Sequence, residues 1–535
     1  MDKVRFGVQL ECSRAAVKTV AQVKRFADAI AKMGYNALYL YTEDVYEIKG
    51  EPYFGHLRGR FTQSELKELD EYCASIGVEL IPAIQTLAHL MRIFKWDVYK
   101  PINDIDDIIL VGDEKTYELI DKMLATVSEC FKTRTVNIGM DEAQHLGLGA
   151  YLNKFGYEKR SEILAKHLSR VSALCKKYNL QPMMWSDMFI RIANNDDYYP
   201  LKPNYKAISA QKCNVPDNIR LIYWDYYHDK KADYERNIKM HELLTNEVVF
   251  AGGVRTWNSF APHQVESSKK MQAAMDVCRE RNVKDVMITT WGDDGNECSQ
   301  FTVLPTLMFI IERYKNGSTR KESDEKFFKL FGVKAENFYA LDALDYYDGK
   351  KHLSFTKFFT YNDPLTGFFD YHIKEGANKY YKSLAAKYKR IINTAGEYAY
   401  LFENAYRLAD FLSVKTELGT ITRKAYLAGD KETLKNLCDK VYPAAIKKLN
   451  AFYAAFRTVW FTDNKPFGFE MHDMRLGGLK MRIEELKARV SDYLNGKITA
   501  IEELEAPVLP YGDFNGHVGE YYFSLCSASA PFGWL

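Results

Sequence analysis

The stretch Thr135-Val136-Asn137-Ile138-Gly139-Met140-Asp141-Glu142 is the one from which we interpret the rest of the chain. Val136 and Ile138 are β-branched and alternate with smaller or polar residues, which is typical of a short buried strand. The strand is followed by two adjacent carboxylates, Asp141 and Glu142. Because neighbouring buried carboxylates repel, their pKa values are expected to separate, which leaves one ionised group and one proton carrier near neutral pH. Such a pair suits acid–base catalysis.

The same dipeptide has a simpler interpretation. An Asp-Glu pair after a strand is often the solvated start of a helix, with the aspartate as its N-cap. The stretch alone leaves both interpretations open, so the remainder of the chain has to decide between them.

The composition favours a large globular protein. The chain has 535 residues, of which 47% are hydrophobic, so a barrel of ~250–300 residues can be followed by a second domain. Aromatic residues make up 14%; they suit a sugar site but are also ordinary core material. Lys and Arg (73) nearly balance Asp and Glu (71), which argues against nucleic acid or an anionic membrane as a partner.

The compartment is inferred from the N-terminus and the cysteines. The first residues, Met1 to Phe6, lack the apolar stretch of a signal peptide, and no later run is long and apolar enough to span a bilayer. The nine cysteines are scattered without a CxxC pair, which predicts reduced, mostly buried thiols in a cytoplasmic protein. No His-x-His or His-Glu-x-x-His pattern occurs, so we expect neither a metal nor another cofactor.

A strand-then-helix rhythm runs from the N-terminus to about residue 315. The predicted strands are Arg5–Leu10, Ala37–Tyr41, Val78–Ile84, Thr135–Met140, Pro182–Trp185, Arg220–Trp224, Val248–Ala251 and Asp285–Thr290. The predicted helices are Thr19–Met33, Ser64–Ile76, Glu114–Phe131, Arg160–Tyr178, Tyr234–Thr245, Val265–Arg281 and Ser299–Tyr314. Only the interval Arg191–Ile219 is irregular. Eight alternating units predict an α/β fold, a (β/α)8 TIM barrel, rather than a doubly wound sheet, since no glycine-rich phosphate loop follows the first strand.

Reactive side chains gather where the predicted strands end. They are Glu11 and Arg14; Glu43 and Asp44; Gln85 and His89; Asp141 and Glu142; Trp185 and Asp187; Trp224 and Asp225; Arg255, Trp257 and Asn258; and Trp291 and Asp293. The carboxyl ends of barrel strands form the rim at which active sites lie. Each residue alone could be core or capping material, but four of the seven tryptophans on one rim favour a site.

The rhythm stops after Gly317. Long helical patterns then cover 374–410, 414–427, 431–460 and 474–494, with Gly477-Gly478 as a break, which predicts a mainly α-helical C-terminal domain. We therefore expect a catalytic barrel over residues 1–316 and a helical domain over 317–535. The aromatic tail 511–535 is expected to pack on the body or on a second subunit, which makes a homodimer one expected assembly.

The rim motifs resemble those of glycoside hydrolase family 20, the β-N-acetylhexosaminidases. The family's fourth strand ends in His-x-Gly-Gly-Asp-Glu, which corresponds here to Asn137 through Glu142, and its third strand ends in Pro-Glu-x-Asp-x-Pro-Gly-His, which corresponds to Pro82 through His89. Trp185, Trp224 and Trp291 occupy the ends of strands five, six and eight. The resemblance covers roughly residues 4–315 and is strongest to a divergent bacterial, intracellular-type branch with a helical C-terminal domain.

Several positions depart from the family pattern. Phe6 stands where the family has its sugar-binding arginine, so Arg14 or Arg255 would have to replace it. Tyr226 or Tyr227 would supply the hydroxyl of a tyrosine that the family carries after strand seven. Gln85 replaces an aspartate, which weakens an Asp–His relay through His89. A small α/β domain often precedes the family's barrel; here the barrel begins almost at Met1, so that domain is expected to be absent or removed.

The resemblance implies an exo-acting enzyme that hydrolyses terminal β-linked GlcNAc or GalNAc on an oligosaccharide or glycoconjugate by a substrate-assisted, retaining mechanism. Glu142 is then the general acid/base, and Asp141 orients the 2-acetamido group. The residues implied in substrate binding are Glu11, Arg14, Asp44, His89, Trp185, Trp224, Tyr226, Tyr227, Trp257, Trp291 and Asp293, with His89 and Asp44 tuning Glu142. Two alternatives stay open: a retaining glycosidase with Asp141 or Glu297 as nucleophile, and a sugar-binding barrel without catalysis.

Overall fold

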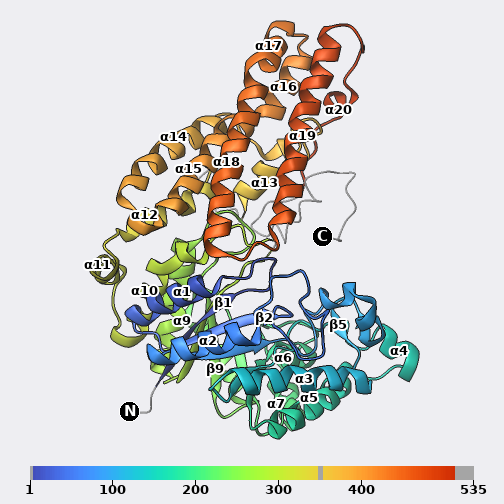
Figure 1. Ribbon diagram of the computed structural model, residues 1–535, viewed down its shortest axis with the longest axis vertical. Coiled ribbons are helices and arrows are strands. Elements are labelled where there is room, and N and C mark those ends of the chain that lie inside the picture. Colours follow the sequence, from blue (N-terminus) through green and yellow to red (C-terminus); the bar gives the residue numbers. More distant parts are fainter. Residues whose placement is uncertain (1–3, 294, 348–353, 512–535) are drawn as a thin grey trace. The chain divides into compact units, whose positions relative to one another are not determined.

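The structure is a computed structural model that describes residues 4–293, 295–347 and 354–511 (Figure 1). Eight parallel strands close into a barrel in the order β1-β10-β9-β8-β7-β6-β3-β2. The strands are β1 (Arg5–Glu11), β2 (Ala37–Glu43), β3 (Glu79–Ile84), β6 (Thr135–Asn137), β7 (Gln181–Trp185), β8 (Arg220–Trp224), β9 (Val248–Gly253) and β10 (Asp285–Thr290). The predicted TIM barrel is confirmed, and each observed strand overlaps its predicted counterpart.

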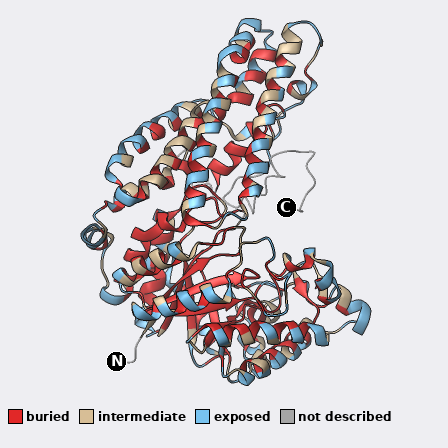
Figure 2. Ribbon diagram, in the orientation of Figure 1, coloured by how far each residue is buried: buried red, intermediate tan, exposed pale blue. Residues whose placement is uncertain are grey.

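Helices cover the outside of the barrel. They are α1 (Val20–Met33), α2 (Gln63–Ser75), α3 (Glu114–Cys130), α5 (Arg160–Lys177), α8 (Lys231–Glu242), α9 (Gln264–Glu280) and α10 (Leu304–Asn316). Their ends follow local rules: Thr19 caps α1 by accepting from the Gln22 amide, and Thr62 and Glu65 form a capping box on α2. Figure 2 shows their buried side facing the strands and their exposed side facing solvent.

Some elements of the barrel were not predicted. The short hairpin of β4 (Asn103–Ile105) and β5 (Ile108–Ile109) and helix α4 (Ala150–Phe155) lie in connections for which the sequence pattern predicts no element. The interval after β7 that we expected to be irregular contains α6 (Asp187–Ala193) and α7 (Tyr205–Ala210). Strand β6 is shorter than predicted because Gly139 and Met140 adopt positive φ angles of 74° and 69°, which no strand continues through.

The chain divides into two compact units that alternate along the sequence. The first comprises Met1–Arg255, Glu266–Trp291 and Thr306–Ser323; the second comprises Thr256–Val265, Gly292–Pro305 and Asp324–Leu535. The second unit is mainly helical, as predicted. Its longest helices are α14 (Ala377–Ile391), α15 (Ala399–Lys415), α16 (Leu418–Leu427), α18 (Tyr442–Asp463) and α19 (Phe469–Leu494).

The helices of the second unit differ from prediction in two places. The segment that we predicted as one helical pattern over 374–410 is interrupted around Gly396, which has a φ of 54°. The Gly477-Gly478 break that we predicted is wrong, since α19 continues through both residues. The prediction for the tail concerns residues that, beyond Tyr511, lie outside the described part. Across the described ranges, we find no helix with the length and apolar character that a membrane crossing requires.

Candidate active site

The turn after β6 places the two adjacent carboxylates through an unusual backbone. Gly139, Met140 and Glu142 all have positive φ, and for a residue with a side chain this conformation costs ~1–2 kcal/mol. A Cβ on Gly139 would lie 1.9 Å from Gln85 Oε1, so only glycine fits there. The Gly139 amide donates to Asn137 Oδ1 (3.0 Å), and its carbonyl accepts from the Trp185 amide (3.1 Å). The turn is therefore fixed both by its own strand, through Asn137, and by the neighbouring strand β7, through Trp185.

Gln85, at the end of β3, holds the first carboxylate. Its Oε1 accepts the Met140 amide (3.1 Å), while its Nε2 donates to Asp141 Oδ1 (2.8 Å) and to the Tyr41 hydroxyl (2.9 Å). An aspartate at this position could not donate these last two bonds. The change that we expected to weaken a relay through His89 thus supplies a direct anchor for Asp141.

His89 lies against both carboxyl groups. Its Nε2 is 3.2 Å from Asp141 Oδ2, without the alignment of a hydrogen bond, and 3.8 Å from Glu142 Oε2. Its backbone, at a φ of 58°, is held by a hydrogen bond that the His89 amide donates to Asp107 Oδ2 (2.8 Å). Burial disfavours the charged ring, but the Asp141 carboxylate outweighs it and raises the pKa of His89 to about 10. An imidazolium at neutral pH therefore faces the pair.

The carboxyl groups near this turn have different environments. Burial alone would raise the pKa of Asp141, but the His89 charge and the Gln85 amide hold it below its ordinary value. Burial and the Asp141 charge raise the pKa of the third carboxyl, Asp187, to about 7. The Glu142 side chain is 47% exposed, so it is accessible from solvent. Asp141 is thus a fixed anion, and the Glu142 side chain is exposed beside it.

Aromatic rings from four strand ends lie together. The rings of Trp185 and Trp291 are 6.0 Å apart, and Tyr41 packs edge-on to Trp291 at 4.9 Å. Trp291 Nε1 donates to the Tyr226 hydroxyl (3.2 Å), and Tyr226 stacks on Trp224 at 5.5 Å. Beside them, Tyr227 is half exposed, with its ring 5.0 Å from that of Tyr226. The buried indole N–H of Trp185 has no partner among the described residues.

Other predicted site residues have protein partners. Glu11 is buried and accepts from the Ser13 amide (2.7 Å) and hydroxyl (2.6 Å), which closes the turn after β1. Arg14 lies 3.6 Å from Glu43 and is 30% exposed.

Asp44 was expected to act with His89 on Glu142, and here the structure differs. Asp44 Oδ1 is paired with Arg58 Nη2 at 2.9 Å, and the carboxylate that holds the backbone of His89 is that of Asp107. Asp107 was missed because its hairpin was not predicted. Tyr41 was missed because its alternating strand position looked like core.

Two of the predicted residues, Trp257 and Asp293, belong to the second unit. So does Glu297, the alternative nucleophile. Its Oε1 lies 3.1 Å from Arg475 Nη1 and its Oε2 lies 3.2 Å from Lys357 Nζ, with all three side chains buried. A carboxylate with both oxygens engaged in this way is a structural ion pair rather than an accessible nucleophile.

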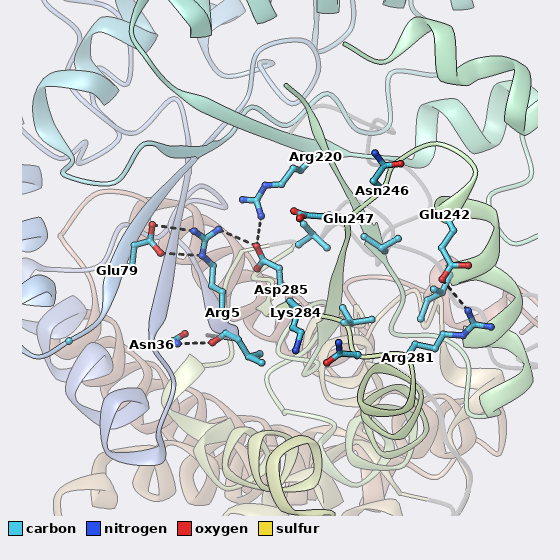
Figure 3. Close-up of a pocket in the computed structure, with 17 residues that line it drawn as sticks. Arg5, Asn36, Glu79, Arg220, Glu242, Asn246, Glu247, Arg281, Lys284 and Asp285 are labelled. Carbon is cyan, nitrogen blue, oxygen red and sulfur yellow. Dashed lines mark hydrogen bonds and ion pairs between the residues drawn. The ribbon is translucent and has the colours of Figure 1, made fainter. Parts of the chain in front are cut away.

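A cavity of about 630 Å³ lies at the opposite, amino end of the barrel strands (Figure 3). Most of its charged lining is already paired: Arg5 with Glu79 and Asp285, Arg220 with Asp285, and Arg281 with Glu242. This end of a TIM barrel serves stability rather than catalysis. The candidate active site is therefore the carboxyl-end cluster around Asp141 and Glu142.

Comparisons with known proteins bear on this site. Residues 6–296 match the family profile described as "Glycosyl hydrolase family 20, catalytic domain", and residues 336–521 match "Glycoside Hydrolase 20C C-terminal domain". Hexosaminidase D of Bos taurus is 23% identical over 211 residues, covering 37% of this chain and 56% of that protein. Hexosaminidase D of Homo sapiens is 20% identical over 225 residues, covering 40% and 44%. The chain thus spans about half the length of these relatives.

One solved structure with a similar chain path is a GH20 exo β-N-acetylglucosaminidase from Vibrio harveyi in complex with N-acetylglucosamine. It has a TM-score of 0.47 and 15% identity, covering 63% of this chain and 58% of that one. The catalytic-domain profile extends over more than half of the 535 residues and ends beyond the last barrel strand. The chain belongs to glycoside hydrolase family 20.

Proposed function

We propose that this chain is an exo-acting β-N-acetylhexosaminidase that removes terminal β-linked GlcNAc or GalNAc by a substrate-assisted, retaining mechanism. The observation that carries the proposal is the arrangement of Asp141, Glu142 and His89: a fixed anion and an accessible carboxyl group, both within 4 Å of one imidazole nitrogen. The hexosaminidase D relatives support the same activity.

In this mechanism, Glu142 protonates the glycosidic oxygen and later removes a proton from the attacking water. The oxygen of the substrate's 2-acetamido group attacks the anomeric carbon, which gives an oxazolinium ion and no bond to the protein. Asp141 accepts the amide N–H and stabilises the positive charge that develops there. His89 holds both carboxyl groups in place.

The aromatic rings are assigned to the sugar. Trp185, Trp224 and Trp291 enclose the acetamide and one face of the ring, and a hydroxyl of Tyr226 or Tyr227 takes the place of the family's amide-binding tyrosine. Arg14 or Arg255, both in the first unit, takes the place of the family's sugar-binding arginine.

The rival glycosidase scheme makes Asp141 a covalent nucleophile. The surroundings of Asp141 argue against this scheme, because both carboxylate oxygens face protein groups: Oδ1 accepts from Gln85, and Oδ2 lies 3.2 Å from His89. This suits a group that orients and neutralises a charge better than one that must move to attack carbon. A sugar-binding barrel without catalysis is the other rival, and it predicts ligand binding that does not depend on the Glu142 carboxyl.

Inhibitor binding tests the proposal. GlcNAc-thiazoline imitates the cyclised intermediate and should bind at least 10²-fold more tightly than GlcNAc, because an enzyme is complementary to the reacting state. Asp141→Asn should weaken thiazoline binding because it removes the negative charge. A covalent adduct with a 2-fluorosugar, or equal affinity for thiazoline and GlcNAc, would argue for a rival scheme.

The wider organisation is part of the same proposal. We assign catalysis to a domain over residues 1–316 and a helical accessory role to 317–535, with a cytoplasmic location and a homodimer as the expected setting. The scattered cysteines, of which all but Cys213 are buried among the described ones, support a reducing compartment.

A further inference from the structure

A third carboxyl group, that of Asp187, contacts the catalytic turn. Asp187 follows β7 as the first residue of α6, and its side chain is completely buried. Its Oδ2 accepts the backbone amide of Glu142 at 3.0 Å. Its Oδ1 has no hydrogen-bond partner in the described part of the chain. A buried polar atom without a hydrogen-bond partner lowers stability. A carboxyl group at this position therefore calls for a reason other than packing.

The amide that Asp187 binds belongs to a residue that needs support. Glu142 has a φ of 53°, a conformation that a glutamate does not adopt without outside constraints. Its side chain is 47% exposed, and its Oε2 lies 3.8 Å from His89 Nε2. Asn137 accepts the Gly139 amide, Gln85 accepts the Met140 amide, and Asp187 accepts the Glu142 amide. Asp187 therefore does for Glu142 what Asn137 and Gln85 do for the two residues earlier in the turn.

The charges around Asp187 come from three segments. Asp141 and Glu142 face it from the turn after β6, Arg191 Nε on α6 lies 3.8 Å from its Oδ2, and the Tyr198 hydroxyl lies nearby in the segment after α6. Burial and the Asp141 charge raise the pKa of Asp187 to about 7, although the hydrogen bond from the Glu142 amide and the Arg191 charge oppose the rise. The charge of this carboxyl group therefore changes within the pH range in which the pair would work.

We propose that Asp187 is a positioning residue for the reaction: it accepts the backbone amide of Glu142 and so fixes that residue, and a negative charge on Asp187 makes the proton of the Glu142 carboxyl group harder to remove. The inference rests on the proposed function. Since Asp187 acts through the backbone of Glu142 and through the field at the pair, it need not touch the substrate.

Two substitutions separate its roles. Asp187→Asn keeps the size and an oxygen that accepts the Glu142 amide, but carries no charge at any pH. Asp187→Leu removes the acceptor as well. Asp70→Asn is a matched control, because Asp70 on α2 is also buried, also accepts a backbone amide (Lys132, 3.2 Å) and also has a raised pKa, at a position outside the site.

The kinetic test uses a β-GlcNAc disaccharide, whose leaving group needs protonation. Asp187→Leu should lower kcat about 10–100-fold with KM changed less than about 3-fold, since a misplaced general acid loses its alignment. Asp187→Asn should stay within about 3-fold of wild type below pH 6, and the basic limb of its kcat/KM profile should move to lower pH. Asp70→Asn should match the wild-type profile.

The outcomes are distinct. If both Asp187 variants lower the melting temperature but keep wild-type kcat and an unshifted pH profile, the residue is merely structural and the inference is overturned. If the wild type does not hydrolyse the disaccharide, the proposed function fails before the variants are compared. A crystal structure of Asp187→Leu then decides whether Asp187 positions Glu142. We expect the φ of Glu142 to leave the positive region, and a φ that stays positive would contradict the positioning role.

Discussion

Replacing Gln85 by methionine should damage both the stability and the chemistry of the barrel. The side chains have similar length, but methionine neither donates nor accepts the three hydrogen bonds of Gln85. The Met140 amide then loses its partner inside a fully buried site, which costs ~1–3 kcal/mol, and Asp141 loses a bond to a charged group worth ~1.5–3 kcal/mol. We expect the free energy of unfolding to fall by about 3–5 kcal/mol and kcat/KM to fall at least 10-fold.

Gln9 on β1 provides the control. It is also completely buried in the barrel, but neither of its side-chain polar atoms has a hydrogen-bond partner within the described residues. Gln9→Met should therefore be neutral or stabilising. Urea unfolding followed by tryptophan fluorescence, with midpoints and slopes compared, measures both variants. A loss below about 1 kcal/mol for Gln85→Met, or an equal loss for both variants, would refute the assignment of Gln85 as the anchor of Asp141.

Three further predictions concern the site. Glu142→Gln should lower turnover of a natural disaccharide by roughly 10²–10⁴-fold but affect cleavage of an activated aryl glycoside less, because such a leaving group needs little protonation; equal losses on both would contradict its role as acid. Trp291→Ala should reduce GlcNAc turnover in a folded enzyme, whereas a core role predicts ~3–5 kcal/mol lower stability with normal kinetics in the enzyme that remains. Because the pKa of His89 is raised from its ordinary 6.5 to about 10, its stabilising charge is fully present below pH 6.5 and is lost as the pH rises to about 10. The difference in melting temperature between wild type and His89→Gln should therefore narrow over this range, and a constant difference would show that the ion pair with Asp141 is absent.

The barrel could be predicted because buried parallel strands are short apolar runs, and those runs repeat with helices between them. The same pattern located the rim, where His89, Asp141, Glu142, Trp185 and Trp291 do come together. The alternation of residues could not predict where β6 ends. The positive φ values of Gly139 and Met140 end the strand, and they depend on hydrogen bonds from the turn to Gln85 and Asn137.

Partnerships between distant residues were the least predictable part. Gln85 was interpreted as replacing an aspartate and weakening a relay through His89, although its amide donates to Asp141, 56 positions along the chain. Asp44 was predicted to act with His89, but it forms an ion pair with Arg58. The carboxylate that accepts the His89 amide is Asp107, which lies in the turn of the short β4–β5 hairpin. Such contacts depend on loop geometry, which periodicity does not encode.

The central claim is that the substrate's acetamide is the nucleophile. Its most direct test is the ratio of kcat/KM for a β-GlcNAc substrate to kcat/KM for the corresponding β-glucoside. Values of kcat/KM are measured for aryl β-GlcNAc and aryl β-glucoside substrates with the same leaving group. A glucoside lacks the acetamide that would attack and the group that Asp141 and the tryptophans would bind, so we predict a ratio of at least 10³, on the order of the losses seen when a reacting group is removed. A ratio near one would contradict the mechanism, whatever the fold.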